Sequence, residues 1–290
     1  MKLARPLLAA CAALALAAPA LAHEFWLRPS RFRAPVDEEV ELGLFVGDRL
    51  RGEPFPRSAT HLARFVSRRG RDEPQEVAGL DGETPAGYLP LEAAGMHVVG
   101  YAGQVRFITL EAAKFEPYLR EKGLEHVVRA RADAGSSDAP GREAYVRCAK
   151  TLVLAGGDDA DDAGFDLPLG LEVEIVPESD PLRARPGDTL TVRVLRDGAA
   201  LAGVLVEAHR GDGEEHAVTA RRTGEDGRAR IVLPHAGFWL VSCVDMRPAP
   251  EELREKADWR SVWASLSFEV REPQDAAAEP SGAAGEQPAK

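Results

Sequence analysis

The residue with the clearest potential for chemistry is His23, which directly follows the tripeptide Ala20-Leu21-Ala22. An Ala-x-Ala tripeptide is typical of a secretory cleavage site, and a cut after Ala22 would make His23 the first residue of the mature protein. A terminal histidine offers a metal ion its free α-amine together with its imidazole, and transition ions that favour nitrogen donors bind both. We therefore expect a metal site at the mature N-terminus. The alternative is an ordinary histidine that cleavage happens to expose.

The segment before His23 has the features of a cleavable export signal. Lys2 and Arg5 form its positive start, and the apolar stretch 7–16 follows them. This stretch is shorter than the roughly 20 apolar residues that a spanning helix needs, and no later segment approaches that length. We therefore predict that residues 1–22 are a signal peptide, and that the mature protein is periplasmic without a transmembrane segment.

Two other cleavage patterns stay open. A cut after Ala20 would leave His23 third from a free amine, where the amine, two backbone nitrogens and the imidazole can enclose Cu(II) or Ni(II) in a square plane. Residues 8–11 resemble a lipoprotein box, which would leave Cys11 lipidated. Without Cys11 only Cys148 and Cys243 remain, and in an oxidising compartment they either pair or stay buried as thiols.

The charge of the chain excludes some partners. The net charge is −11, and removing residues 1–22 with their two cations makes it more negative still. Nucleic acid and anionic membrane surfaces are poor partners for such a protein, whereas cations are favourable ones.

Short β-like runs between turn residues predict an all-β fold. They occur at 39–46, 62–66, 96–101 and 105–110, and again at 171–176, 189–195, 204–209, 229–233 and 238–244. Residues 189–194 alternate polar and apolar side chains, as a strand with one face on a core does. We predict two immunoglobulin-like or transthyretin-like β-sandwich modules, over 23–110 and 169–270.

The two halves also resemble each other. The glycine-led segment 95–101 matches 237–243, and the turn at 81–84 occupies the place of the turn at 225–228. Only the first copy carries a histidine, His97, where the second has Trp239.

Between the modules, 111–168 reads as a helical insertion with an acidic linker. We expect helices at 111–122 and 124–132 and a third helical stretch from 138 to 150. Residues 271–290, rich in Ala, Glu, Pro and Gly, are expected to be a disordered tail.

Five residues are candidate metal ligands. His23 and His97 belong to the same module, and strand alternation places His97 on the face opposite Met96 and Val98. Glu24 and Asp245 could supply a carboxylate, and His126 could fold over the first module from the helical insertion. Each has a structural alternative, which for His97 is packing between the sandwich and the insertion. The remaining histidines of the second module, His209, His216 and His235, are expected on the surface.

A family resemblance rests on residues spread over the chain: 23–27 with Pro29, 95–101, 137–143 through 148–150, and Trp259 with 263–266. In combination they resemble the domain of unknown function 4198 family, exported bacterial proteins commonly grouped with periplasmic components of cobalt and nickel uptake. The resemblance covers nearly all of 23–270. It implies a metal-handling protein with nickel or cobalt as its ion and a membrane transporter as its partner.

Other functions are less well supported by the residues. A copper oxidative enzyme could hold its ion in a brace of His23 and His97, and the affinity order alone would favour copper at a terminal amine. However, aromatic residues make up only 6% of the chain, and no Ser/His/Asp set or phosphate-binding glycine loop is evident. We therefore expect a binding protein rather than an enzyme, with a structural or adhesive module as the alternative.

Overall fold

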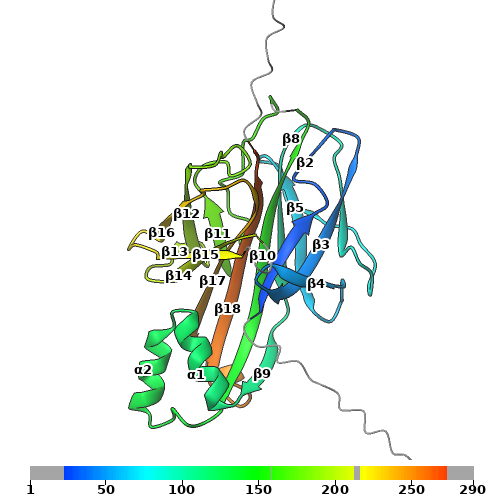
Figure 1. Cartoon of the computed structure of the whole chain (residues 1–290). Helices are drawn as coiled ribbons and strands as arrows, with labels where there is room; N and C mark the ends of the chain where they lie inside the picture. The colour runs from blue at the N-terminus through cyan, green and yellow to red at the C-terminus, as the bar shows by residue number, and fades with distance from the viewer. Residues whose placement is uncertain (1–22, 158, 212–215, 273–290) are drawn as a thin grey trace, which may run out of the picture.

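The computed structural model describes residues 23–157, 159–211 and 216–272. The expected signal peptide with Cys11, and the expected tail beyond residue 272, lie outside these residues. Strands dominate the described part, and the all-β sandwich class is confirmed (Figure 1). None of its helices is long and apolar enough to cross a membrane.

The strands form a central sheet and two small sheets. The central sheet contains β2 (Arg33–Ala34), β5 (Leu62–Arg69), β6 (Gln75–Glu76), β8 (Gly95–Gly103), β9 (Arg106–Leu110), β10 (Gly141–Ala155), β14 (Leu205–Arg210), β15 (Ala217–Arg222), β17 (Gly237–Pro248) and β18 (Trp259–Val270). The first small sheet contains β1 (Glu24–Pro29), β3 (Glu39–Asp48), β4 (Arg51–Phe55) and β7 (Gly87–Pro90). The second contains β11 (Val173–Pro177), β12 (Thr189–Arg196), β13 (Ala199–Ala200) and β16 (Arg228–Val232).

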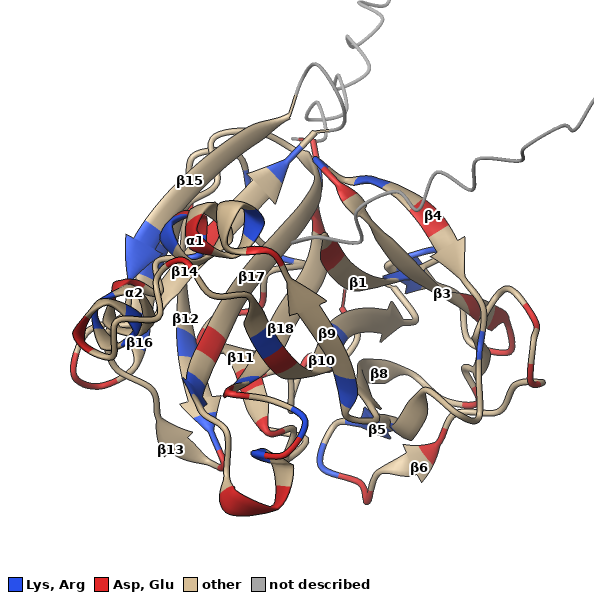
Figure 2. Ribbon diagram, turned by 90° about the horizontal axis from the view of Figure 1, so that it is seen from below, with Lys and Arg blue, Asp and Glu red and all other residues tan. Residues whose placement is uncertain are grey.

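The two small sheets pack on opposite faces of the central sheet. Along β8, Met96 and Val98 belong to the core under the second small sheet, whereas Val99 and Tyr101 belong to the core under the first. His97 therefore points to the face opposite Met96 and Val98, as alternation predicted. Figure 2 shows the two halves on either side of β10 and β18.

The predicted internal repeat is visible in the topology. The main path of the central sheet is β15-β14-β17-β18-β10-β8-β5-β6, and its two middle strands, β10 and β18, are parallel. In order outward from the middle, β17, β14 and β15 of one half correspond to β8, β5 and β6 of the other. A twofold rotation about an axis parallel to β10 and β18 would exchange these two strands and also the two faces of the sheet. The parallel pairing of β10 with β18, and the small sheets on opposite faces, fit such an approximate axis. The two halves therefore share one sheet.

The glycines that led to the repeat have equivalent places. Gly95 pairs with Ala155 at the end of β10, and Gly237 pairs with Val270 at the end of β18. Both have positive φ, 134° and 110°, a conformation that side chains disfavour. The glycine therefore turns the chain into the late strand of each repeat.

The segment between the halves departs from expectation in one element. The helices expected at 111–122 and 124–132 are confirmed as α1 (Ala112–Glu121) and α2 (Glu125–Asp133), which lie together at one end of the molecule (Figure 1). The third helical stretch, expected from 138 to 150, is wrong, because 141–155 form β10. This strand lies in the middle of the sheet and is buried on both faces, so it lacks the alternation that marks a half-buried strand.

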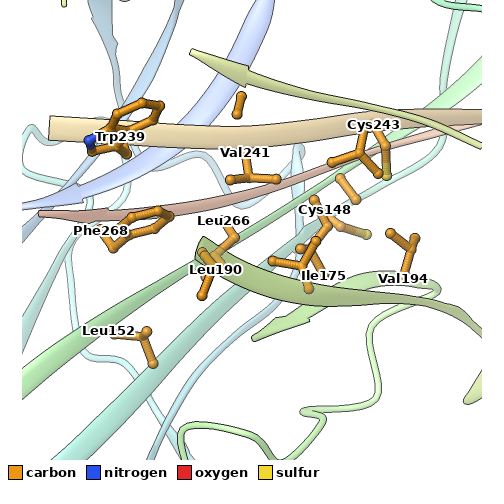
Figure 3. Packing of buried hydrophobic residues seen from close by; sticks show 14 of the residues in the cluster. Cys148, Leu152, Ile175, Leu190, Val194, Trp239, Val241, Cys243, Leu266 and Phe268 are labelled. Carbon is orange, nitrogen blue, oxygen red and sulfur yellow. The ribbon is translucent and has the colours of Figure 1, made fainter. Parts of the chain in front are cut away.

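Cys148 and Cys243 are buried free thiols rather than a disulfide. Both register with Ala264 of β18, Cys148 from β10 and Cys243 from β17, so one strand lies between them. Two strand spacings of about 4.8 Å separate them by about 10 Å, beyond the reach of a disulfide. Figure 3 shows both sulfurs in the apolar layer that also contains Ile175 and Val194.

Candidate metal site at the start of strand β1

The start of β1 is fixed against the central sheet. Phe25 and Leu27 are buried in the core of the first sandwich, and their carbonyl oxygens accept hydrogen bonds from the hydroxyls of Ser265 and Ser267 on β18. His23 lies at the beginning of this strand and is partly exposed. A mature N-terminus at His23 would therefore have a defined position.

The side chain next to it, Glu24, is 6% exposed and belongs to a buried ion cluster. Nζ of Lys122, the residue after α1, lies 3.4 Å from Oε1 of Glu24 and 2.9 Å from Oε2 of Glu207 on β14. Oε2 of Glu24 is buried and has no hydrogen-bond partner among the described residues. One carboxylate oxygen beside His23 is thus left unsatisfied.

The electrostatics of this cluster are dominated by burial. Burial raises the pKa of Glu24, an effect that the Lys122 ammonium opposes without cancelling. Burial disfavours the charged form of Lys122, but the Glu207 and Glu24 carboxylates outweigh it and raise the Lys122 pKa. Lys122 therefore stays protonated, with Glu207 as its closer partner.

Two histidines lie beside these carboxylates. His209, two residues after Glu207 on β14, is 3% exposed, so the expectation of a surface residue is wrong for it. Its Nδ1 lies 3.1 Å from Nε2 of the partly exposed His216, and its Nε2 lies 3.2 Å from Oγ of Ser242. The even-numbered β14 residues Val206 and Ala208 face the core under the second small sheet, so His209 lies on the opposite face with Glu207, which contacts Lys122. His235, by contrast, is exposed as expected.

The imidazoles of this pair resist protonation. Burial, reinforced by the nearby charges of Lys122 and His216, lowers the pKa of His209 to about 3. Burial also lowers the pKa of His216, although the carboxylates of Asp48 and Glu207 act in the opposite direction. We refer to Glu24, Lys122, Glu207, His209 and His216, together with His23, as the β1 cluster.

The structure does not bring His97 to this cluster. His97 pairs with Val153 of β10, which lies two residues beyond the β10 partner of Ser267. His23 lies on the other side of this level, four residues before Leu27, whose carbonyl oxygen bonds to the hydroxyl of Ser267. About six residues at roughly 3.3 Å each separate the two histidines by about 20 Å along the sheet. They cannot hold one ion together in this structure.

His97 has a different environment of its own. It is 7% exposed and its Nε2 is buried without a partner among the described residues. Burial lowers its pKa, with smaller and opposing effects of Arg69 and Asp72. It lines a cavity of about 350 Å³ beside β6, at the far end of the first sandwich.

His126 and Asp245 lie together, but each is already engaged. Both line a cavity of about 650 Å³ between α2 and β17. Nε2 of His126 lies 2.8 Å from the carbonyl oxygen of Met246. Asp245 accepts hydrogen bonds from the guanidinium groups of Arg196 and Arg247. These contacts engage Nε2 of His126 and Oδ2 of Asp245.

Among the described residues, no three or more His, Cys, Asp or Glu side chains converge as a complete metal site. Lys122, Glu207, His209 and His216 were not among the predicted site residues. The spacing of Glu207 and His209, two apart on one strand, is a signal that places both on one face. Any metal site at the β1 cluster therefore needs a further donor, and the α-amine of His23 is one that cleavage would supply.

The sequence model of the family described as a domain of unknown function, DUF4198, matches residues 20–246. The chain belongs to this family. No curated protein matches the chain. The matched range includes all of the β1 cluster, and the family description assigns no activity to it.

Proposed function

We propose that this DUF4198 protein is exported to the periplasm, loses residues 1–22 and binds a divalent transition metal at the start of β1. Nickel or cobalt is the proposed cargo, with copper as a further candidate. The protein would serve as an accessory component of metal uptake and pass its ion to a membrane transporter. The metal and the transporter come from the family resemblance, and the place of the site comes from the β1 cluster.

The observation that carries the proposal is the unsatisfied Oε2 of Glu24 beside His23. A buried polar atom without a partner costs about 1–3 kcal/mol, so such atoms call for an explanation. Glu24 directly follows His23 in the chain, and we propose that an ion held by the amine and imidazole of His23 also meets this carboxylate. Its oxygen could then join two nitrogen donors, a set that suits Ni(II), Co(II) and Cu(II).

The charge of the cluster supports a cationic ligand. Glu24 and Glu207 provide two carboxylates against the single ammonium of Lys122, and Glu121 lies 3.4 Å from the same ammonium. The local excess of negative charge favours a divalent cation over an anion. The brace of His23 and His97, on which the oxidative-enzyme alternative rested, has no geometric support because the two lie far apart.

The decisive experiment compares the mature N-terminus with a blocked one. Mass spectrometry of the exported protein should give His23 as the first residue. Calorimetric titration of Ni(II), Co(II) and Cu(II) should then show that His23→Ala, and a version with one alanine before His23, bind at least about 10-fold more weakly. Substitution of the exposed His235 by Ala is the matched control and should leave affinity unchanged. Equal affinity in all four proteins would show that the terminal histidine is not a ligand.

A further inference from the structure

We propose that His209 and His216 form a two-imidazole clamp that binds a divalent transition ion through Nδ1 of His209 and Nε2 of His216. This inference rests on the proposed function, because it names further ligands within the β1 cluster. It is carried by different atoms, and it can fail while the N-terminal site stands.

The first argument is the separation of the two nitrogens. Nδ1 of His209 and Nε2 of His216 are 3.1 Å apart. Two nitrogens bound to one ion at about 2.0–2.1 Å, with an angle near 90–109°, lie roughly 2.8–3.4 Å apart. The pair therefore already has the spacing of two neighbouring ligands on one ion, and a turn of each ring by roughly 40° would direct both lone pairs at it.

The second argument is the hydrogen bond on the other side of His209. A hydrogen bond between two neutral imidazoles uses one N–H and one lone pair, so neither facing nitrogen has a lone pair available for an ion while it lasts. Nε2 of His209 lies 3.2 Å from Oγ of Ser242, a hydroxyl that can accept as well as donate. His209 can therefore carry its proton on Nε2 and donate it to Ser242, while His216 carries its own on Nδ1. Both facing nitrogens then bind the ion without net loss of a proton, and Ser242 orients the inner ring as a supporting residue does in metal sites.

The third argument is the negative charge near the rings and the kind of ion that imidazole binds. Asp48 and Glu207 contribute negative charge at His216. Imidazole suits Ni(II), Co(II), Cu(II) and Zn(II), which defines the class of ion.

The pair is also positioned by rigid elements. His209 lies within β14, whose neighbours are β15 and β17, and Ser242 lies on β17 directly opposite Glu207. The rings of His209 and His216 stack with centroids 5.3 Å apart and an interplanar angle of 30°. The inner ligand and its hydroxyl partner are therefore fixed by the central sheet before any ion arrives.

The test uses the mature protein and Co(II), whose visible absorption reports ligand geometry, with Ni(II) titrated in parallel. His216→Gln is the main variant, because His216 is partly exposed and its substitution should not disturb folding. It should weaken binding at least about 10-fold and alter the Co(II) spectrum. Ser242→Ala should weaken binding about 10-fold, the lower end of the effect of supporting residues. His235→Gln is the control and should change nothing, and circular dichroism should confirm that all variants fold.

The outcomes separate the two proposals. If His216→Gln and Ser242→Ala bind as the wild type does while His23→Ala loses the ion, the clamp is overturned and the N-terminal site stands. If His23→Ala keeps its affinity while His216→Gln loses it, the clamp is supported and the terminal site is overturned. If the wild type binds none of these ions, both proposals are overturned.

Discussion

At the scale of single residues, Glu143 has an unusual environment that the metal proposals do not involve. It is 3% exposed, and its Oε1 accepts hydrogen bonds from the hydroxyls of Tyr118, at 3.2 Å, and of Ser261. Burial raises its pKa, and the hydrogen bonds from Ser261, Tyr118 and Trp263 only partly oppose this. A carboxylate with these neutral partners is costly to keep ionised.

Glu143→Gln should therefore be more stable than the wild type at pH 8, because it removes the buried charge. The glutamine keeps an acceptor oxygen for Tyr118 and Ser261. Because the folded pKa lies above the unfolded one, the folded wild type takes up a proton first as pH falls. The wild type thus becomes more stable as the pH falls through the pKa of Glu143 in the folded protein. The stability advantage of Glu143→Gln should therefore shrink toward pH 5.

The measurement is urea unfolding of Glu143→Gln and wild type at pH 8, 6 and 5. Glu269→Gln, an exposed position on β18, is the control and should track the wild type at each pH. An advantage that stays constant with pH would mean that the raised pKa is not its source.

At the scale of elements, Lys122 links three segments that are distant in the sequence. It follows α1, and its ammonium contacts Glu24 of β1 and Glu207 of β14 while being 3% exposed. The helix is otherwise held to the sheet by Phe115 and Leu119, which are fully buried. The ion cluster therefore fixes where the end of α1 lies relative to the proposed site.

Lys122→Met should lower the free energy of unfolding by about 3–5 kcal/mol, because it leaves the buried Glu24 and the partly buried Glu207 without their counter-charge. Guanidinium unfolding should show this as a lower midpoint with an unchanged slope. Lys114→Met, on the exposed side of the same helix, is the matched control. Adding Glu207→Gln to Lys122→Met should restore part of the loss, and a double variant no better than the single one would contradict the ion-pair explanation.

The elements that sequence reasoning found and missed differ in their burial. The runs at 39–46 and 189–195 alternate because β3 and β12 each have one face on a core, and both were predicted as strands. The middle strands β10 and β18 are buried on both faces and show no such alternation. One was taken for a helix and the other was not assigned. Alternation of polar and apolar residues arises when one face of a strand is exposed to water. It therefore cannot identify strands at the centre of a sheet that is covered on both sides.

The site shows the same limit. The sequence singled out His23 and Glu24 as candidates because cleavage and strand start are local features. His97 was placed on the correct face but grouped with His23, and only the parallel pairing of β10 and β18 reveals that they lie at different ends of the sheet. The approach of Lys122 to Glu24 depends on how α1 packs, which no local pattern encodes.

At the scale of the whole molecule, the two repeats have diverged at equivalent positions. The registers of β1 with β3 and of β11 with β12, together with the turns that end β3 and β12, make Glu24 equivalent to Glu174. Both oxygens of Glu174 are engaged: Oε1 lies 2.7 Å from Nζ of Lys150, and Oε2 accepts hydrogen bonds from the backbone N–H groups of Gly170 and Leu171. Glu24 has one cation and an unsatisfied oxygen. In the second repeat, protein groups satisfy both oxygens of this carboxylate. In the first repeat, one oxygen has no partner among the described residues, and it lies where the proposed ion would bind.

The shared central sheet also makes the repeats one folding unit. Met96 and Val98 of the first repeat lie in the same core as Val241 and Leu266 of the second. The core under the second small sheet therefore contains side chains of both repeats, and the hydroxyls of Ser265 and Ser267 on β18 bond to β1 of the first repeat. We therefore expect a single cooperative thermal transition, with calorimetric and van't Hoff enthalpies in agreement.

Leu266→Ala tests this coupling from the second repeat. Leu266 is fully buried on β18, so its truncation should destabilise the protein by about 2–5 kcal/mol through lost burial and a residual cavity. If the repeats unfold together, hydrogen exchange should then accelerate equally for the slowest amides of β3 in the first small sheet and of β12 in the second. Val232→Ala, at a side chain 52% exposed, should leave both unchanged. Faster exchange in β12 with unchanged protection in β3, or two separate calorimetric peaks, would show that the repeats are independent despite their common sheet.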